Sequence, residues 1–194
     1  MQLFNQIFTG MKTLTTAVSF FLISFFIVST VDAQERTTDR VWASPNASVA
    51  QTIGLTEIYL TYGRPGVRDR EIFGGLVPYD QVWRTGANES TVVVFGDDVF
   101  VEGELVPEGT YSIYTIPGTE HWTIIINNKL SWGTQYDASE DFLRVTVRPE
   151  ESFHIEQMMI YFENVTDTSG DLVIHWDNVK VPVRIEPAVE LPQD

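Results

Sequence analysis

Residues Phe142–Arg148 read "FLRVTVR", and this stretch decides the class of the fold. Its second, fourth and sixth residues are Leu, Val and Val, whereas the third, fifth and seventh are Arg, Thr and Arg. A period of two places the apolar residues on one face of an extended segment and the polar residues on the other. This pattern is typical of an antiparallel strand with one buried face and one face in water.

Similar short runs follow one another along the chain. They are rich in Val, Ile, Thr, Tyr, Phe and Trp, and Gly, Pro, Asn or Asp often separate them. No segment of helical length shows a convincing 3.6-residue period. We therefore expect an all-β protein, a single antiparallel β-sandwich or jelly roll of about ten strands. The predicted strands are Val49–Ile53, Glu57–Tyr62, Thr91–Phe95, Val99–Glu102, Thr110–Ile116, Trp122–Asn127, Phe142–Arg148, Gln157–Phe162, Leu172–Trp176 and Val179–Ile185, the last at an edge or bulge because of Pro182.

The N-terminal segment predicts export, and the two ends of the chain set the bounds of the domain. Residues 1–33 have one cation at Lys12, an apolar stretch from about residue 17 to 28, and a Val-Asp-Ala sequence before Gln34. These features are typical of a secretory signal peptide, with Met1 or Met11 as the start. We expect a flexible leader over 34–43, one domain over 44–186 and a tail over 187–194. The mature protein is then periplasmic or extracellular.

The composition limits the classes of partner. The chain has 12 basic and 27 acidic residues, a net charge of −15, and no cysteine. Such a charge repels phosphate backbones and anionic lipid surfaces, so we expect neither a nucleic-acid partner nor membrane association after signal removal. Without cysteine there are no disulfides and no lipid-modified N-terminal cysteine. The three histidines are isolated, and we expect no metal and no cofactor.

Residues 63–90 form a long connection between two predicted strands. Structureless loops of this length are uncommon in compact domains and are usually functional or packed on themselves. Its many apolar residues predict an ordered loop. It also carries four of the chain's arginines, namely Arg64, Arg68, Arg70 and Arg84, together with four acidic residues.

Several segments also resemble a known family. They are "LTYGRPGVRDREIFGGLVPYDQVWRTGANEST", "VEGELVPEGTYSIYTIPG", "WTIIIN", "SWGTQYD", "DFLRVTVRPE" and "LVIHWDNVKVPVRI". The sequence from about residue 43 to 185 is similar to an uncharacterised family of secreted bacterial proteins, known only as a domain of unknown function. The resemblance implies a bacterial, exported protein and assigns no catalytic residue.

The loop supplies the candidate ligand-binding residues. Arginine forks bind carboxylate, sulfate or phosphate, and an aromatic face beside polar side chains suits a sugar ring. Equally, the arginines can pair with the loop's own carboxylates, and the tryptophan can belong to the core. The candidates are Arg64, Arg70, Trp83, Arg84, Asn88 and Glu89.

Three functions remain open from the sequence. The first is an exported binding module for a small polar or anionic ligand, with a saccharide favoured. The second is a glycosidase-like hydrolase that uses Glu89 and a second carboxylate such as Asp69, Glu71 or Asp137. The third is a structural or interaction domain in which the loop only closes the fold. A pocket with two carboxylates indicates the second function, and a fully paired arginine network indicates the third.

Overall fold

The structure is a computed structural model that describes residue 36 and residues 39–189. The predicted signal peptide lies outside the described residues, as do parts of the predicted leader and tail. The described chain contains ten strands and one 3-10 turn at Ala138–Glu140. Within that part of the chain, no helix is long and apolar enough to span a bilayer.

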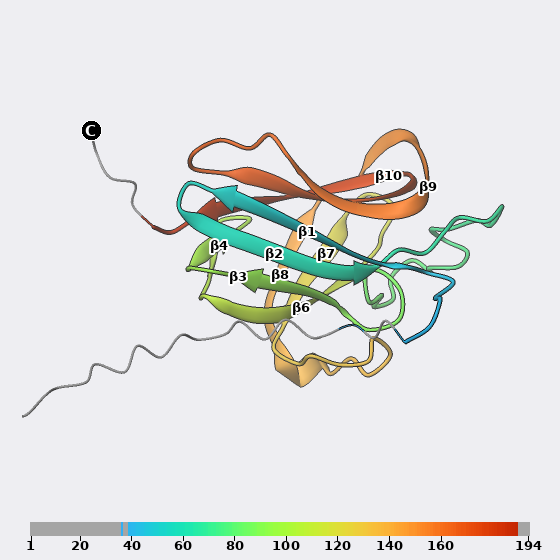
Figure 1. Ribbon diagram of the computed structural model, residues 1–194. Coiled ribbons are helices and arrows are strands. Elements are labelled where there is room, and N and C mark those ends of the chain that lie inside the picture. Colours follow the sequence, from blue (N-terminus) through green and yellow to red (C-terminus); the bar gives the residue numbers. More distant parts are fainter. Residues whose placement is uncertain (1–35, 37–38, 190–194) are drawn as a thin grey trace, which may run out of the picture. The chain divides into compact units, whose positions relative to one another are not determined.

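The strands form two antiparallel sheets that face each other as a sandwich (Figure 1). This arrangement confirms the predicted all-β class. The six-stranded sheet has the order β1 (Asn46–Ile53), β2 (Thr56–Gly63), β3 (Thr91–Phe95), β6 (Gly109–Ile116), β7 (Trp122–Asn127) and β8 (Asp141–Val147). The four-stranded sheet has the order β5 (Glu104–Val106), β4 (Val99–Val101), β10 (Gly170–Pro187) and β9 (Glu150–Glu163).

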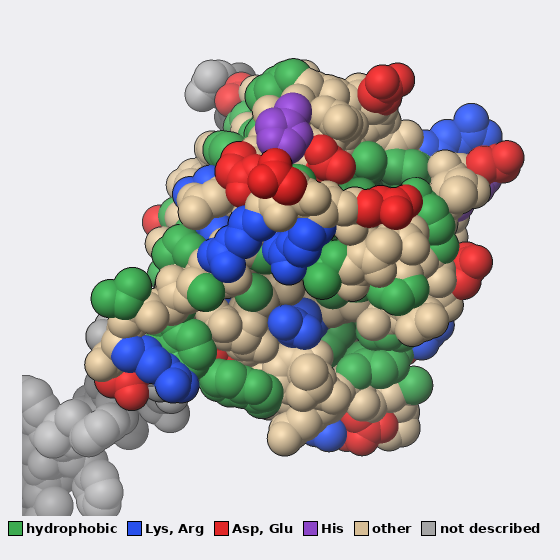
Figure 2. Space-filling model, turned by 90° about the vertical axis from the view of Figure 1, so that its right-hand side faces the viewer, with side chains coloured by type: hydrophobic (Ala, Val, Ile, Leu, Met, Phe, Trp, Pro, Cys, Tyr) green, Lys and Arg blue, Asp and Glu red, His purple; other side chains and the backbone are tan. Residues whose placement is uncertain are grey.

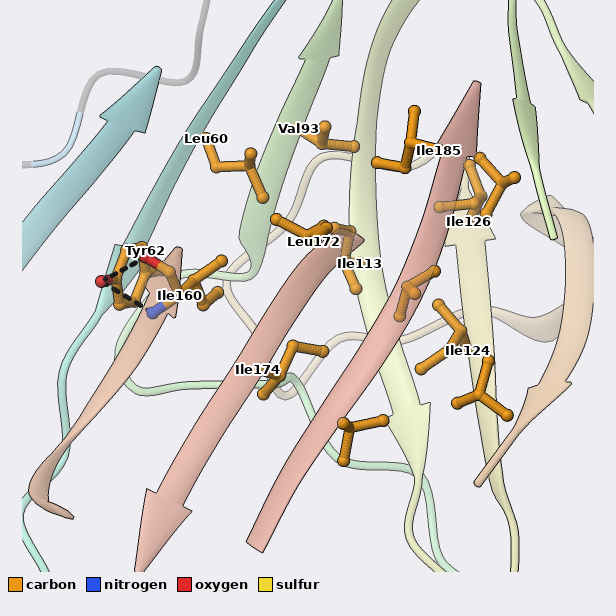
Figure 3. Packing of buried hydrophobic residues seen from close by; sticks show 14 of the residues in the cluster. Leu60, Tyr62, Val93, Ile113, Ile124, Ile126, Ile160, Leu172, Ile174 and Ile185 are labelled. Atoms are coloured by element: carbon orange, nitrogen blue, oxygen red, sulfur yellow. Dashed lines mark hydrogen bonds between the residues drawn. The ribbon is translucent and has the colours of Figure 1, made fainter. Parts of the chain in front are cut away.

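The core lies between the two sheets, where the inward-facing side chains of their strands meet (Figure 3). Burial of these aliphatic side chains is the main driving force for folding in a chain without disulfides. Tyr62 also ties the two sheets together. Its hydroxyl donates to the carbonyl oxygen of Ile160 at 3.3 Å and accepts from the Ile160 amide at 2.9 Å.

Two local predictions were wrong. The predicted strands Leu172–Trp176 and Val179–Ile185 are one strand, β10, because Asp177 adopts a left-handed conformation (φ 56°) at a bulge and not at a turn. Pro182 therefore lies in an inner strand and not at an edge. It falls between Lys180, the last residue paired with β9, and Ile185, the first paired with β4.

The long loop is ordered, as predicted, and occupies 64–90 because β2 continues through Gly63. Its beginning runs along the edge of β9, where the Val67 amide donates to the carbonyl oxygen of Glu156 at 2.8 Å. Its later part extends the six-stranded sheet. There the amide of Trp83 donates to the carbonyl oxygen of Thr115 at 2.7 Å, and the Thr115 amide donates back at 2.9 Å. The loop is thus attached to both sheets.

Candidate ligand-binding site

A pocket of about 270 Å³ opens beside the long loop. Among the described residues, three arginines and no Asp or Glu contribute to its lining, although the chain as a whole is strongly acidic. Figure 2 shows the side of the domain toward which the loop extends in Figure 1, with Lys and Arg side chains gathered near its middle. The lining residues are Ser44, Pro65, Gly66, Arg68, Arg70, Leu76, Val77, Trp83, Arg84, Gly86, Ala87 and Trp176.

Two tryptophans supply the apolar wall of the pocket. The indoles of Trp83 and Trp176 stack with their centroids 5.8 Å apart and their planes 20° apart. The rings of Phe73 and Trp122 pack edge-on around them, and the centroids of these two rings are 4.9 Å apart. Trp83 remains partly exposed, whereas Trp176 and Trp122 are buried. In the structure, Trp83 therefore has two roles: it packs against the core and it forms part of the pocket wall.

Arg84 is a partly buried arginine that lines the pocket. It forms no hydrogen bond or ion pair with any described residue, and its Nε atom is buried. Burial lowers the pKa of the Arg84 guanidinium, and the nearby Tyr114 opposes this shift. An arginine stays charged in a protein despite such a shift, so a cation is held here in a partly desolvated position. A bound anion would satisfy both its charge and its N–H donors.

The other two pocket arginines are held by backbone carbonyls. Arg70 donates from Nε to the oxygen of Val67 at 3.0 Å and from Nη2 to the oxygen of Gly66 at 2.6 Å. Arg68 donates from Nη2 to the oxygen of Ala43 at 2.5 Å. Neither guanidinium group forms an ion pair with a carboxylate within the described part of the chain, although the backbone amide of Arg68 donates to Oε1 of Glu156 at 3.1 Å. Because carbonyl bonds do not neutralise charge, both guanidinium groups stay available to an anion.

The backbone beside Arg84 is strained. Thr85 has φ 56°, an unusual conformation for a β-branched residue, and it is fully buried. Its carbonyl oxygen accepts from the Thr91 hydroxyl at 2.6 Å, which holds the conformation. Gly86 follows with φ 152°, and a Cβ atom there would lie 2.9 Å from the carbonyl oxygen of Gly63. Residues held in this way cluster at ligand-binding sites.

Three of the sequence candidates do not line the pocket. Arg64 donates from Nε to the carbonyl oxygen of Met158 at 2.8 Å. Asn88 donates from Nδ2 to the carbonyl oxygen of Ser44 at 3.0 Å. Glu89 is buried and pairs with Arg36 at 3.2 Å. The structure thus brings together Arg70, Trp83 and Arg84, while the other three fix the surrounding backbone; their contact with a ligand stays a prediction.

Sequence reasoning did not select Arg68 or Trp176. Arg68 is one of the four arginines of the long loop, but nothing in the sequence around it distinguished it as a ligand-binding residue. Trp176 lies in a strand 93 positions after Trp83, so only the folded chain brings them together. A large buried aromatic in a strand is by itself a core signal.

The described residues do not place the carboxylate pair needed for glycoside hydrolysis at this pocket. Neither Glu89 nor any of the suggested second acids, Asp69, Glu71 and Asp137, contributes to the lining. Over residues 39–189 and Arg36, no cluster of three or more His, Cys, Asp or Glu is arranged to hold a metal ion.

Comparison with known proteins identifies a family and no individual relative. No curated protein and no solved structure matches the chain. The profile of the family described as "Protein of unknown function (DUF2911)" matches residues 44–185, well over half of the sequence. The matched segment contains the long loop and every residue that lines the pocket. The chain belongs to the DUF2911 family.

Proposed function

We propose that the protein is a binding module for a small anionic ligand, and that the ligand is a saccharide with a carboxylate or sulfate group. One observation carries this proposal. Arg84 is a partly buried cation with no hydrogen-bond or ion-pair partner among the described residues, and it faces a pocket that two further arginines line. Leaving a buried donor unsatisfied costs about 1–3 kcal/mol, which a bound anion recovers.

The wall of the pocket supports a sugar as the non-ionic part of the ligand. A ring with apolar C–H faces and polar hydroxyls suits a site that has an aromatic surface on one side and hydrogen-bond donors on the other. Trp83 offers that aromatic surface, and Arg68 and Arg70 offer the donors. A volume of about 270 Å³ suits a ligand of one sugar ring.

The two alternatives have less support. For hydrolysis, Glu89 is paired with Arg36, and none of the described residues that line the pocket carries a carboxylate. For a purely structural loop, the arginines ought to pair with the loop's acids. Instead, no ion pair joins Arg64, Arg68, Arg70 or Arg84 to a carboxylate of the described chain. A loop whose only task is to close the fold gains nothing from an unpaired cation.

The predicted signal peptide supports a function outside the cytoplasm, and we propose that the mature protein begins near Gln34. Intact-mass measurement of the exported protein tests this. Retention of residues 20–28 in the product contradicts the proposal.

A thermal-shift titration tests the binding proposal. Sulfate, glucuronate and galacturonate are each added at constant ionic strength, with chloride and neutral glucose as controls. An anion that binds only the folded protein stabilises it by about 2.7 kcal/mol at a hundred times its Kd. We expect the melting temperature of the wild type to rise with at least one of the three anions.

Arg84→Gln removes the unpaired cation and is expected to abolish this rise. Arg148→Gln is the matched control, because Arg148 is exposed and lies outside the pocket. It makes the same change in charge and is expected to keep the wild-type shift. Equal shifts in the wild type and Arg84→Gln overturn the proposal, and so does the absence of a shift with all three anions.

A further inference from the structure

A second aromatic surface lies next to the pocket. Trp132 is 45% exposed, although a tryptophan is among the most costly residues to leave in water. Its ring contacts Trp42, with the centroids 6.4 Å apart and the planes 50° apart. The guanidinium carbon of Arg40 lies 3.9 Å from the Trp42 centroid. We call Arg40, Trp42 and Trp132 the tryptophan platform.

The platform is physically continuous with the pocket. Gly133 follows Trp132 and packs so closely on Arg84 that a Cβ atom there would lie 2.2 Å from the Cδ atom of Arg84. On the other side, Ser44 is two residues after Trp42 and lines the pocket. The platform therefore sits at the rim beside the unpaired guanidinium.

The backbone around Trp132 is held by hydrogen bonds. Trp132 forms a β-bridge with Glu89, and the amide of Ser90 donates to the carbonyl oxygen of Ser131 at 3.1 Å. The carbonyl oxygen of Trp132 accepts from the Gln135 amide at 2.8 Å. An exposed indole on a rigid backbone is pre-organised, so a ligand that stacks on it orders little of the protein on binding.

We propose that the tryptophan platform is a second subsite and that the ligand is an acidic oligosaccharide. This inference rests on the proposed function. The pocket suits one ring, so a longer chain must leave it at the rim, where Trp132 offers the face for the next ring. Arg40, the third member of the platform, adds a cation for a second acidic group. In a chain of acidic sugar units, each unit has a ring that can stack on an indole and an acidic group that can bind an arginine, as at the pocket and again at the platform.

Calorimetric titration with uronates of the gluco and galacto series, each as monomer and trimer, tests the inference. We expect the trimer of the series that binds to bind the wild type about tenfold or more tightly than its monomer. Trp132→Ala is expected to lower trimer affinity to the level of the monomer and to leave monomer affinity unchanged. Arg84→Gln is expected to abolish the binding of both the monomer and the trimer.

The possible failures are distinct. If a monomer binds but its trimer binds no more tightly, or if Trp132→Ala leaves the trimer's advantage intact, the second subsite is wrong and the pocket stands. If no uronate binds but sulfate does, the anion site stands and the saccharide is wrong. If Trp132→Ala changes the sedimentation behaviour of the protein and not the trimer affinity, the platform is a contact between copies of this chain.

Discussion

Arg36 and Glu89 form an ion pair in which both side chains are only 5% exposed. Arg36 also donates from Nη2 to the carbonyl oxygens of Ser90, at 2.6 Å, and Thr61, at 3.2 Å. Burial lowers the pKa of Arg36, and the charge of Glu89 opposes this shift. A residue of the segment predicted as a flexible leader is therefore anchored at the end of the long loop.

Arg36→Ala is expected to reduce the free energy of unfolding by about 3–5 kcal/mol, because it leaves the Glu89 carboxylate buried without its counter-charge. Urea denaturation measures this change. Removing both charges, with Arg36→Met and Glu89→Leu together, is expected to restore part of the loss. Lys129→Ala is the control, since the Lys129–Asp137 pair is 40% and 43% exposed and contributes at most about 1 kcal/mol. Equal losses in Arg36→Ala and Lys129→Ala contradict the structural role of the buried pair.

Trp83→Ala is expected to reduce the free energy of unfolding by about 3 kcal/mol, the lower end for a buried aromatic, because Trp83 is only partly buried. The loss follows from its contacts with Trp176 and Phe73. The same change is expected to weaken anion binding, since Trp83 lines the pocket. Trp132→Ala removes an exposed indole and is expected to cost less than about 1 kcal/mol. Denaturant midpoints that fall equally in both variants speak against a core role for Trp83.

The sequence predicted the strands well where apolar and polar residues alternate regularly. The prediction of strand ends failed where a residue type occurs both in turns and in bulges. In "WDNV", Asp177 and the following Asn resemble a turn, yet the left-handed Asp177 forms a bulge inside β10. Asx residues favour both structures, so composition alone does not separate them. β5 was missed because three residues carry no measurable period.

The candidate site was predictable only as a loop. Its length and its arginines indicated where to look, but the partners of each arginine come from distant parts of the chain. Arg64 reaches Met158, 94 positions away, and Glu89 is engaged by Arg36, 53 positions away. Such contacts leave no local pattern. The sequence therefore could not tell that Arg84, and not Arg64, is the arginine left for a ligand.

Tyr136 is expected to make the stability of the fold depend on pH in the alkaline range. Its hydroxyl donates to Asp141 Oδ2 at 2.6 Å, and burial followed by this hydrogen bond raises its pKa from 10.0 to about 12. Below pH 10.0 both states keep the proton, and the full contribution to stability is present. Between pH 10.0 and about 12 the unfolded chain loses the proton first, so stability falls as the pH rises. Denaturation across this window is expected to show a shallower fall for Tyr136→Phe than for the wild type. Parallel curves contradict the assignment, because the other raised tyrosines, Tyr111 and Tyr161, contribute equally to both proteins.

The unpaired Arg84 predicts a conflict between stability and binding. Arg84→Met replaces a partly buried cation that has no described partner with an apolar side chain of similar length. Relief of the unsatisfied donor is expected to raise the free energy of unfolding without ligand by about 1 kcal/mol and to abolish the stabilisation by anions. Arg64→Met is the matched control. It removes the bond to Met158 and is expected to destabilise the domain. Denaturation of both variants with and without sulfate or a uronate measures the two effects. If Arg84→Met is less stable than the wild type in the absence of anions, Arg84 is a structural tie and the pocket loses the argument for its ligand.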